Sequence, residues 1–259
     1  SDFDIILISE SWLNDSVFNN ELVPTQYNIF RCDRKFLRVN KSRGGGVLAA
    51  FNEKYKICCL DTSVLDNIVP LVDIFLCKCF IGSLNLIFGV LYIPPDISLD
   101  DLETFISAVE QFLLYQNFIL IGDFNVPDIS NVSTASTSKA SCMQHFINIL
   151  NCTQYNHIQN CDNKLLDLVL SNTNFELSVS HSSFPLVAED RYHPALNVNV
   201  NICSTPKFHS FPSNNQKCYN FRKADFVSLY NTLCNTDWSY LAHFVNIDEC
   251  GFRLKLNLP

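Results

Sequence analysis

The sequence predicts an α/β fold in which two β-sheets pack face to face and helices lie outside them. Short apolar or alternating runs typical of strands recur throughout residues 1–202, whereas few segments have helical spacing. The strands do not alternate regularly with helices, which argues against a doubly wound parallel sheet. The chain has 259 residues, 47% hydrophobic and 17% charged, which suits one domain of about 200 residues plus an extension.

Runs rich in apolar and β-branched residues predict the strands. In chain order they are Ile5–Ser9, Gly46–Phe51, Ile57–Leu60, Ile74–Cys79, Leu86–Tyr92, Phe118–Ile121, Leu166–Leu170, Leu177–Ser180 and Ala195–Val200. Helical spacing predicts one helix at Leu99–Tyr115, with Ser98 and Asp100 as caps, and another at Ala140–Leu150.

A change of composition divides the chain. Residues 201–217 are rich in Pro, Ser and Asn without any period, which indicates a linker. We therefore expect a main domain at 1–202, a linker at 203–218 and a further segment at 219–259, where Tyr219–Tyr240 again has helical spacing. The sole methionine is Met143 and the chain starts in a core-like strand, so we interpret it as an excised piece of a longer protein.

Charge and cysteine content exclude several classes of protein. A net charge of −8 argues against the broad basic face of a nucleic-acid binder and fits carboxylates gathered around a metal ion, or basic partner domains elsewhere. The 12 cysteines show no CxxC pair and no zinc-site spacing, so we interpret them as small apolar residues of a reducing compartment. Without an apolar run near the ~18 residues of a membrane span, or a signal peptide pattern, we expect a soluble chain.

One apolar strand ends in the sequence GDFN, residues 122–125. A period of two places Asp123 and Asn125 on one side and turns Phe124 into the core. A carboxylate that holds a water, beside an amide that donates to an oxyanion, suits hydrolysis. From this stretch alone, an Asx turn leading into Pro127 explains the same residues equally well.

Other strand ends repeat this pattern. Glu10 follows the first strand, Tyr92 ends a strand before two prolines, and Asp167 is a lone carboxylate in an apolar run, where an unpaired charge would be costly. Asp190 and His193 precede the last strand. Each has a plain structural explanation, such as a helix cap, a core aromatic, a buried acceptor or a surface imidazole. Together they could hold a hard cation, a water and a phosphate.

An ordered series of motifs carries a resemblance to a known family. The motifs are ESWL at 10–13, SRGGGVL at 42–48, GVLYIPP at 89–95, ILIGDFN at 119–125, LLDLVLS at 165–171 and DRYHPAL at 190–196. The series resembles the endonuclease/exonuclease/phosphatase superfamily, most closely the endonuclease domain of non-LTR (LINE-type) retrotransposons. The resemblance covers residues 1–202. The stretch at 219–238 is similar to the connector that joins such a domain to reverse transcriptase.

The resemblance implies a four-layered α/β sandwich of the DNase I-like type that cleaves phosphodiester bonds with Mg2+ or Mn2+. It implies that Glu10 binds the metal and that Tyr92 contacts the scissile phosphate or its leaving oxygen. Asp123 would orient or deprotonate the attacking water. Asn125 would steady the phosphate.

The resemblance further implies that Asp167 acts near the leaving group and that His193, supported by Asp190, binds or protonates a phosphoryl oxygen. The family usually places its last acid and histidine side by side, whereas Arg191 and Tyr192 separate them here. We therefore hypothesise that Asp190 no longer orients His193 directly.

Two further features complete the comparison with the family. The run Arg43-Gly44-Gly45-Gly46 matches a turn that enters a strand, and we give it no catalytic role. The family's first strand carries an asparagine that completes the metal site, and we expect the part of the domain present here, 1–202, to lack that strand.

The leading functional hypothesis is a metal-dependent endonuclease that nicks target DNA for retrotransposition. Its partners would be DNA, contacted by loops such as 40–43, and the reverse transcriptase domain of a parent polyprotein. We expect a monomer, intracellular, and nuclear if the parent element is active. Two alternatives stay open: an inactive truncated or decayed copy that keeps the fold, and a phosphatase of the same superfamily.

Overall fold

The computed structural model describes residues 3–35, 44–130, 138–202 and 226–236. The chain forms two separate units, residues 1–204 and 205–259. In the second unit the described part contains one helix, α5 (Phe226–Asn235), within the segment expected to be helical. The linker expected at 203–218, the loop at 40–43 and most of 219–259 lie outside the described residues.

The described residues of the first unit form three β-sheets. The largest has the strand order β4-β5-β6-β7-β9-β8, and the others have the orders β1-β3-β2 and β10-β11. The strands are β1 (Ile5–Ser9), β2 (Tyr27–Cys32), β3 (Val47–Asn52), β4 (Lys56–Cys59), β5 (Asp73–Ile81), β6 (Leu84–Tyr92), β7 (Phe118–Asp123), β8 (Thr153–Gln154), β9 (Asp167–Ser171), β10 (Glu176–His181) and β11 (Leu196–Asn201).

The predicted strands all coincide with strands of the structure, and β2 and β8 are additional. In β2, Asn28 and Arg31 interrupt the apolar pattern, so this strand lacked a signal. Strand β8 has two residues, Thr153 and Gln154, which is too short for any periodic signal. The α/β class and the packing of sheets with helices are confirmed.

The helices of the first unit are α2 (Ser63–Ile68), α3 (Leu99–Leu113) and α4 (Ser138–Ile149), with short 3-10 helices η1 (Asn19–Glu21) and η2 (Pro127–Ser130). Helix α3 begins after Ser98, whose Oγ accepts the Asp101 N–H at 3.0 Å and donates to the Asp101 carboxylate at 2.7 Å. Asp100, predicted as a second cap, instead lies inside the first turn, where its charge favours the positive end of the helix.

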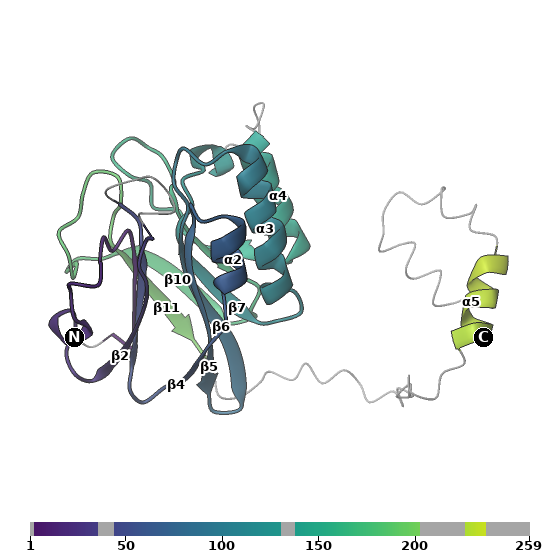
Figure 1. The fold of residues 1–259 in the computed structure, drawn as a ribbon, viewed down its shortest axis with the longest axis horizontal. Coiled ribbons are helices and arrows are strands. Elements are labelled where there is room, and N and C mark those ends of the chain that lie inside the picture. Colours follow the sequence, from purple (N-terminus) through teal and green to yellow (C-terminus); the bar gives the residue numbers. More distant parts are fainter. Residues whose placement is uncertain (1–2, 36–43, 131–137, 203–225, 237–259) are drawn as a thin grey trace. The chain divides into compact units, whose positions relative to one another are not determined.

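Two hydrophobic cores lie on opposite faces of the six-stranded sheet. Helices α2, α3 and α4 gather on one face (Figure 1), where side chains such as Phe105 and Val109 belong to one cluster with Leu120 of the sheet. On the other face, Phe51 of β3 packs with Phe88 of β6. The sheet is therefore buried on both sides, which explains its nearly continuous apolar strands.

The outer face of the three-stranded sheet has a different cover. Ile6, Tyr27 and Leu48 form a third cluster there, contacted by Leu13 and Leu22. These two residues belong to the segment 10–26, which is irregular apart from η1. In the described chain the predicted outer helices thus cover the six-stranded sheet, while segment 10–26 covers the three-stranded sheet. Among the described residues no helix is both long and apolar enough to cross a membrane.

Gly122 allows the parallel strands β6 and β7 to approach each other. Gly122 is paired with Leu91, and a Cβ at residue 122 would lie 2.0 Å from the Leu91 carbonyl oxygen. That oxygen belongs to the backbone of a central strand and cannot move aside as a flexible side chain could. The glycine is therefore required by space.

We expect Gly122→Ala to destabilise the first unit by about 2 kcal/mol or more, because the clash is with rigid backbone. The melting temperature, followed by circular dichroism, should fall by about 4–8 °C. Gly82→Ala is the matched control, since Gly82 has a φ of +61° but nothing lies within 4 Å of its added Cβ. Equal losses in the two variants would contradict the close-approach explanation.

Candidate active site

Strand register brings four polar side chains into one row across the six-stranded sheet. Asp73 of β5 is opposite Tyr92 of β6, Tyr92 is opposite Asp123 of β7, and Asp123 is opposite Asp167 of β9. Opposed residues of neighbouring strands point to the same face of a sheet. The row therefore faces the layer that contains β3, at the end of the strands where β6 and β7 finish.

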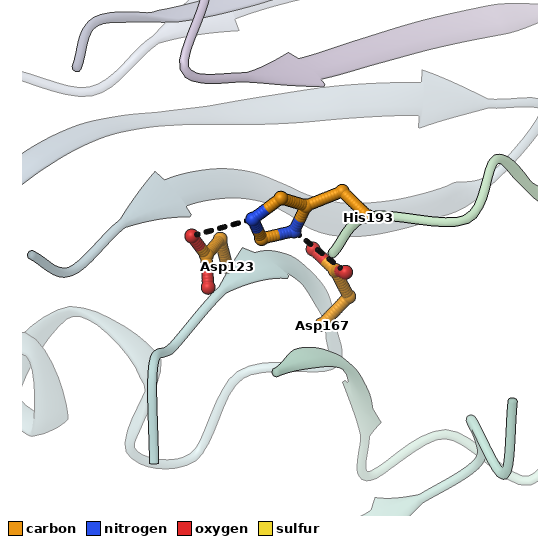
Figure 2. A group of neighbouring side chains, drawn as sticks. All are labelled: Asp123, Asp167 and His193. Atoms are coloured by element: carbon orange, nitrogen blue, oxygen red, sulfur yellow. Dashed lines mark hydrogen bonds and ion pairs between the residues drawn. The ribbon is translucent and has the colours of Figure 1, made fainter. Parts of the chain in front are cut away.

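His193 lies between two carboxylates of this row (Figure 2). Its Nδ1 is 3.0 Å from Asp167 Oδ2, and its Nε2 is 3.7 Å from Asp123 Oδ2. His193 belongs to the segment that leads into β11, whereas the carboxylates come from β7 and β9. Residues far apart in the sequence thus form one compact acid–imidazole–acid group.

Burial and like charge change the acidity of Asp123. Its side chain is 1% exposed, and this burial is the main cause that raises its pKa to about 8. The charge of Asp167 raises it further, while the charge of His193 and the Asn125 N–H oppose the rise. Since the pKa lies near neutral, Asp123 can both hold and release a proton in the working range of most enzymes.

His193 is held in its charged form. Burial alone would lower its pKa, but the hydrogen bond and charge of Asp167, with the charges of Asp123 and Asp190, raise it to about 9. With both ring nitrogens protonated, Nδ1–H donates to Asp167 and Nε2–H points toward Asp123. The imidazole can therefore donate a hydrogen bond into the space beside Asp123.

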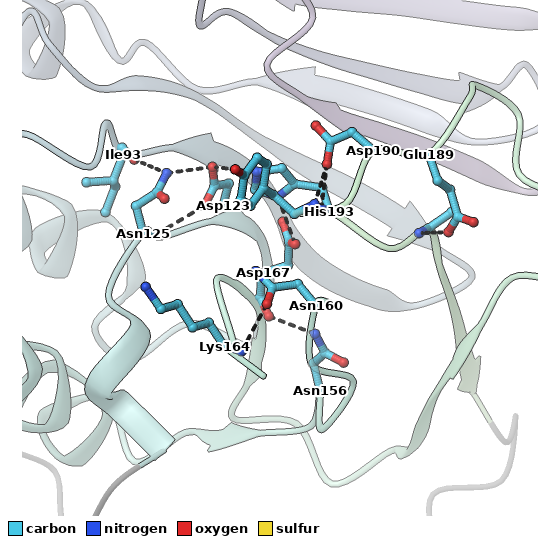
Figure 3. Close-up of polar contacts among 12 residues, drawn as sticks. Ile93, Asp123, Asn125, Asn156, Asn160, Lys164, Asp167, Glu189, Asp190 and His193 are labelled. Carbon is cyan, nitrogen blue, oxygen red and sulfur yellow. Dashed lines mark hydrogen bonds and ion pairs between the residues drawn. The ribbon is translucent and has the colours of Figure 1, made fainter. Parts of the chain in front are cut away.

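Asn125 supports Asp123 on its other side (Figure 3). Its Nδ2 donates to Asp123 Oδ2 at 2.6 Å and to the Ile93 carbonyl at 2.9 Å, and its backbone N–H donates to Asp123 Oδ1 at 3.1 Å. The last contact is an Asx turn with Asn125 in a left-handed conformation, φ +50°. The Asx turn expected for GDFN is confirmed, it directs the Asn125 amide at Asp123, and Phe124 is buried. The hydrolytic role of the two residues stays a prediction.

Glu10 joins the row through Tyr92. Burial is the main cause that raises the pKa of the Tyr92 hydroxyl above its ordinary value, and a hydrogen bond to the Glu10 carboxylate is the next. Glu10 comes directly after β1 and has a φ of +53°, which is unusual for a residue with a side chain. A left-handed turn therefore brings this carboxylate to the tyrosine.

The side chains suit a hard divalent cation. The nearest side-chain oxygen and nitrogen atoms of Asp123, Asp167 and His193 all lie within 4.8 Å of one another. While His193 is charged, only the two carboxylates of this group can bind the ion. Glu10, the predicted metal ligand, lies outside this group, but its carboxylate bonds Tyr92 and its charge acts on Asp123. Oxygen-rich sites of this kind prefer Mg2+ or Mn2+ to softer metals.

Asp190 contacts the backbone of the histidine segment. Its Oδ1 accepts the N–H groups of Tyr192 at 2.6 Å and His193 at 2.8 Å, while the ring of His193 is bonded to Asp167 (Figure 3). The two intervening residues thus place the Asp190 carboxylate at the turn, where it fixes the backbone that carries the imidazole.

Two supporting groups were missed in the sequence. Asn156 is fully buried and donates from Nδ2 to the Asp167 carbonyl at 2.7 Å. Asp73, the end of the row, is bonded to Arg34. Asp73 did carry a signal, because it is a lone carboxylate beside an apolar run, as Asp167 is. Arg34 and Asn156 lie in stretches without a pattern.

Comparison with known proteins adds information on the fold. No family model matches the sequence, and no curated protein matches it. Among solved structures, the endonuclease domain of TRAS1, a telomere-specific non-LTR retrotransposon, is similar with a TM-score of 0.53 and 14% identity, over 76% of this chain and 85% of that one. The described sheets and helices thus share the overall fold of that domain. The human Nocturnin catalytic domain is similar with a TM-score of 0.51 and 12% identity, over 76% and 81% of the two chains.

These likenesses show the fold alone, and identities this low leave function to be argued from the site. The structure brings together Glu10, Tyr92, Asp123 and Asn125. Asp167 and His193 complete the group. The roles assigned to these residues stay predictions.

The metal-free chain should lose stability as pH rises from 6.5 to 9. The pKa of His193 is about 9 in the fold against 6.5 when unperturbed, so the folded chain binds more protons in this window and is destabilised as they leave. The raised pKa of Asp123, about 8 against 3.8, acts in the same direction between pH 4 and 8. The His193 contribution is on the order of 3 kcal/mol.

Thermal unfolding in EDTA across this pH range measures the effect. His193→Gln should flatten the dependence between pH 6.5 and 9, whereas His157→Gln, at an exposed histidine of another loop, should leave it unchanged. A melting temperature of the parent chain that stays level or rises over this window would contradict the proton-binding account.

Proposed function

We propose that the chain is a divalent-metal-dependent phosphodiester hydrolase, and specifically an endonuclease that nicks DNA for retrotransposition. The observation that carries the proposal is the group of Asp123, Asp167 and His193 in one row with Tyr92. It combines a proton acceptor of near-neutral pKa with a charged imidazole a few ångströms away.

The chain's own residues divide the work of hydrolysis. Asp123, held by Asn125, orients a water and takes its proton as the new P–O bond forms. His193, fixed by Asp167, donates from Nε2 to a phosphoryl oxygen and so stabilises the charge that develops there. The P–O bond to the leaving sugar oxygen breaks with its electron pair staying on that oxygen, which takes a proton from solvent water and becomes a 3′ hydroxyl.

Tyr92 and Glu10 complete the proposed site. The Tyr92 hydroxyl bonds the Glu10 carboxylate in the structure. In the proposed reaction it contacts the scissile phosphate or its leaving oxygen. A divalent cation held by Glu10 and the carboxylates of the row would act as a Lewis acid on the phosphate. The donor atoms described above fit that ion.

Nicking for retrotransposition is supported by the ordered motifs of the sequence and by the likeness to the TRAS1 endonuclease domain. We infer DNA as the substrate, a monomeric chain, and the reverse transcriptase domain of a parent polyprotein as the neighbouring domain. Because the net charge is −8, binding of DNA by this chain alone should be weak and sensitive to salt.

The decisive experiment is nicking of supercoiled plasmid in Mg2+, by this chain and by a version extended with an upstream strand. Asp123→Ala should lower the rate by about 100- to 10,000-fold, since it removes the proton acceptor. Asp100→Ala, at an exposed carboxylate of α3 on the opposite side of the sheet, is the matched control and should nick as the parent does.

The other outcomes separate the alternatives. Intact plasmid with both folded chains would reject the endonuclease and favour an inactive copy. Release of inorganic phosphate from an inositol phosphate, with plasmid left intact, would favour the phosphatase.

A second comparison concerns the histidine segment. His193→Ala should cost about 100- to 10,000-fold in nicking rate, because the donor to the phosphate is lost. Asp190→Ala should cost about tenfold or less, because it removes hydrogen bonds to backbone and leaves the Asp167 contact in place. Equal losses in the two variants would show that Asp190 orients the imidazole itself.

A further inference from the structure

A buried ion pair closes the row of polar residues at its β5 end. Arg34 Nε donates to Asp73 Oδ2 at 2.9 Å, and Arg34 Nη2 donates to the same oxygen at 2.5 Å. Nη2 also donates to the Leu71 carbonyl at 2.8 Å. The two side chains are 1% and 5% exposed. Desolvation offsets much of the attraction in a buried pair, so stability alone explains little of its presence. What the pair touches is more informative.

Tyr92 is the first neighbour of the pair. Asp73 is directly opposite Tyr92 in the β5–β6 ladder, and the Arg34 guanidinium lies 4.9 Å from the centre of the Tyr92 ring. At this distance the cation is attracted to the face of the ring. The pair thus holds the ring whose hydroxyl bonds Glu10.

The glycine turn is the second neighbour. Asp73 Oδ2 also accepts the Gly46 N–H at 2.8 Å. The carbonyls of Gly46 and Gly45 in turn accept the N–H groups of Ser11 and Trp12, each at 2.9 Å. Ser11 directly follows Glu10, so hydrogen bonds run from the carboxylate of the pair to the turn that presents Glu10.

The turn passes so close to the pair that only glycine fits. A Cβ at Gly45 would lie 2.2 Å from Arg34 Nε and 2.6 Å from Asp73 Oδ2. The φ angles of Gly45 and Gly46 are +79° and +80°. On the facing turn, Glu10 and Trp12 have φ angles of +53° and +54°, which cost free energy and persist only when neighbouring structure imposes them.

We propose that Arg34 and Asp73 form a positioning pair, which fixes Tyr92 through its ring and Glu10 through the glycine turn for attack on the phosphate. The proposal rests on the hydrolase function above. It assigns a role to the SRGGGVL motif, for which the sequence suggested only a turn.

The test replaces the whole pair. Arg34→Met with Asp73→Leu leaves no buried charge without a partner, so the fold should survive. The matched control is Lys35→Met with Asp66→Leu. It removes the ion pair made by the next residue along the chain, in which Lys35 Nζ lies 2.6 Å from Asp66 Oδ2 and the lysine side chain is exposed.

Two readouts distinguish positioning from stability. Amide hydrogen exchange at Ser11 and Trp12, relative to amides of β3, should rise about tenfold or more in the Arg34/Asp73 variant and stay unchanged in the control. The nicking kcat should fall about 10- to 100-fold in the Arg34/Asp73 variant, because small misplacements of this kind are costly. In a Glu10→Gln, Tyr92→Phe background, the same replacement should have almost no further effect on kcat.

The exchange and kcat measurements can each contradict the positioning role of Arg34 and Asp73. Unchanged relative exchange at Ser11 and Trp12, or a full further loss of kcat in the Glu10→Gln, Tyr92→Phe background, would overturn the proposal. If the parent chain does not nick plasmid, the hydrolase function fails while the exchange experiment still decides the positioning.

If the double replacement does not fold, Arg34→Lys takes its place. Lysine keeps the charge but cannot bond both Asp73 and Leu71 while it also covers the Tyr92 ring. The same exchange and kcat criteria then apply to that variant.

Discussion

The register of one parallel strand pair, β6 with β7, determines the row of polar side chains on which the candidate site is built. It sets Tyr92 beside Asp123, and the antiparallel neighbours β5 and β9 then add Asp73 and Asp167 to the same row. A slip of one residue would turn Asp123 toward the helices and put a hydrophobic side chain in its place. Gly122 fixes this register by permitting the close approach of the two backbones.

The three carboxylates of the row differ in how far their negative charge is offset by neighbouring groups. Its two outer carboxylates each have a cationic partner, Arg34 at Asp73 and His193 at Asp167. The middle carboxylate, Asp123, has the Asn125 amide and only the more distant Nε2 of His193. Burial therefore acts most strongly on Asp123, and a cation would find the least compensated charge there. The same arrangement that raises its pKa makes the middle of the row the natural place for a metal ion and a water.

Sequence patterns predicted those parts of the site that lie on regular strands. A lone carboxylate in an apolar run indicated Asp167, and the same rule applied to the run LVDIFL would have indicated Asp73. Arg34 could not be predicted, because its partner is 39 positions away and only the tertiary fold brings them together. The contact of Asp167 with the imidazole, in place of Asp190, depends likewise on how the segment before β11 crosses the sheet. The residue preferences at helix starts also predicted Ser98 as a cap, but they predicted Asp100 equally, which lies inside the first turn.

The irregular segment 10–26 covers the outer face of the three-stranded sheet and begins with Glu10. Arg31 anchors it by donating to the carbonyls of Val17 and Asn14, each at 2.7 Å. Segments with little regular hydrogen bonding open locally at a lower free energy than the core strands. On heating, Glu10 should therefore be released while both cores of the six-stranded sheet stay intact. The heat resistance of the proposed activity would then depend on this cover and not on the cores.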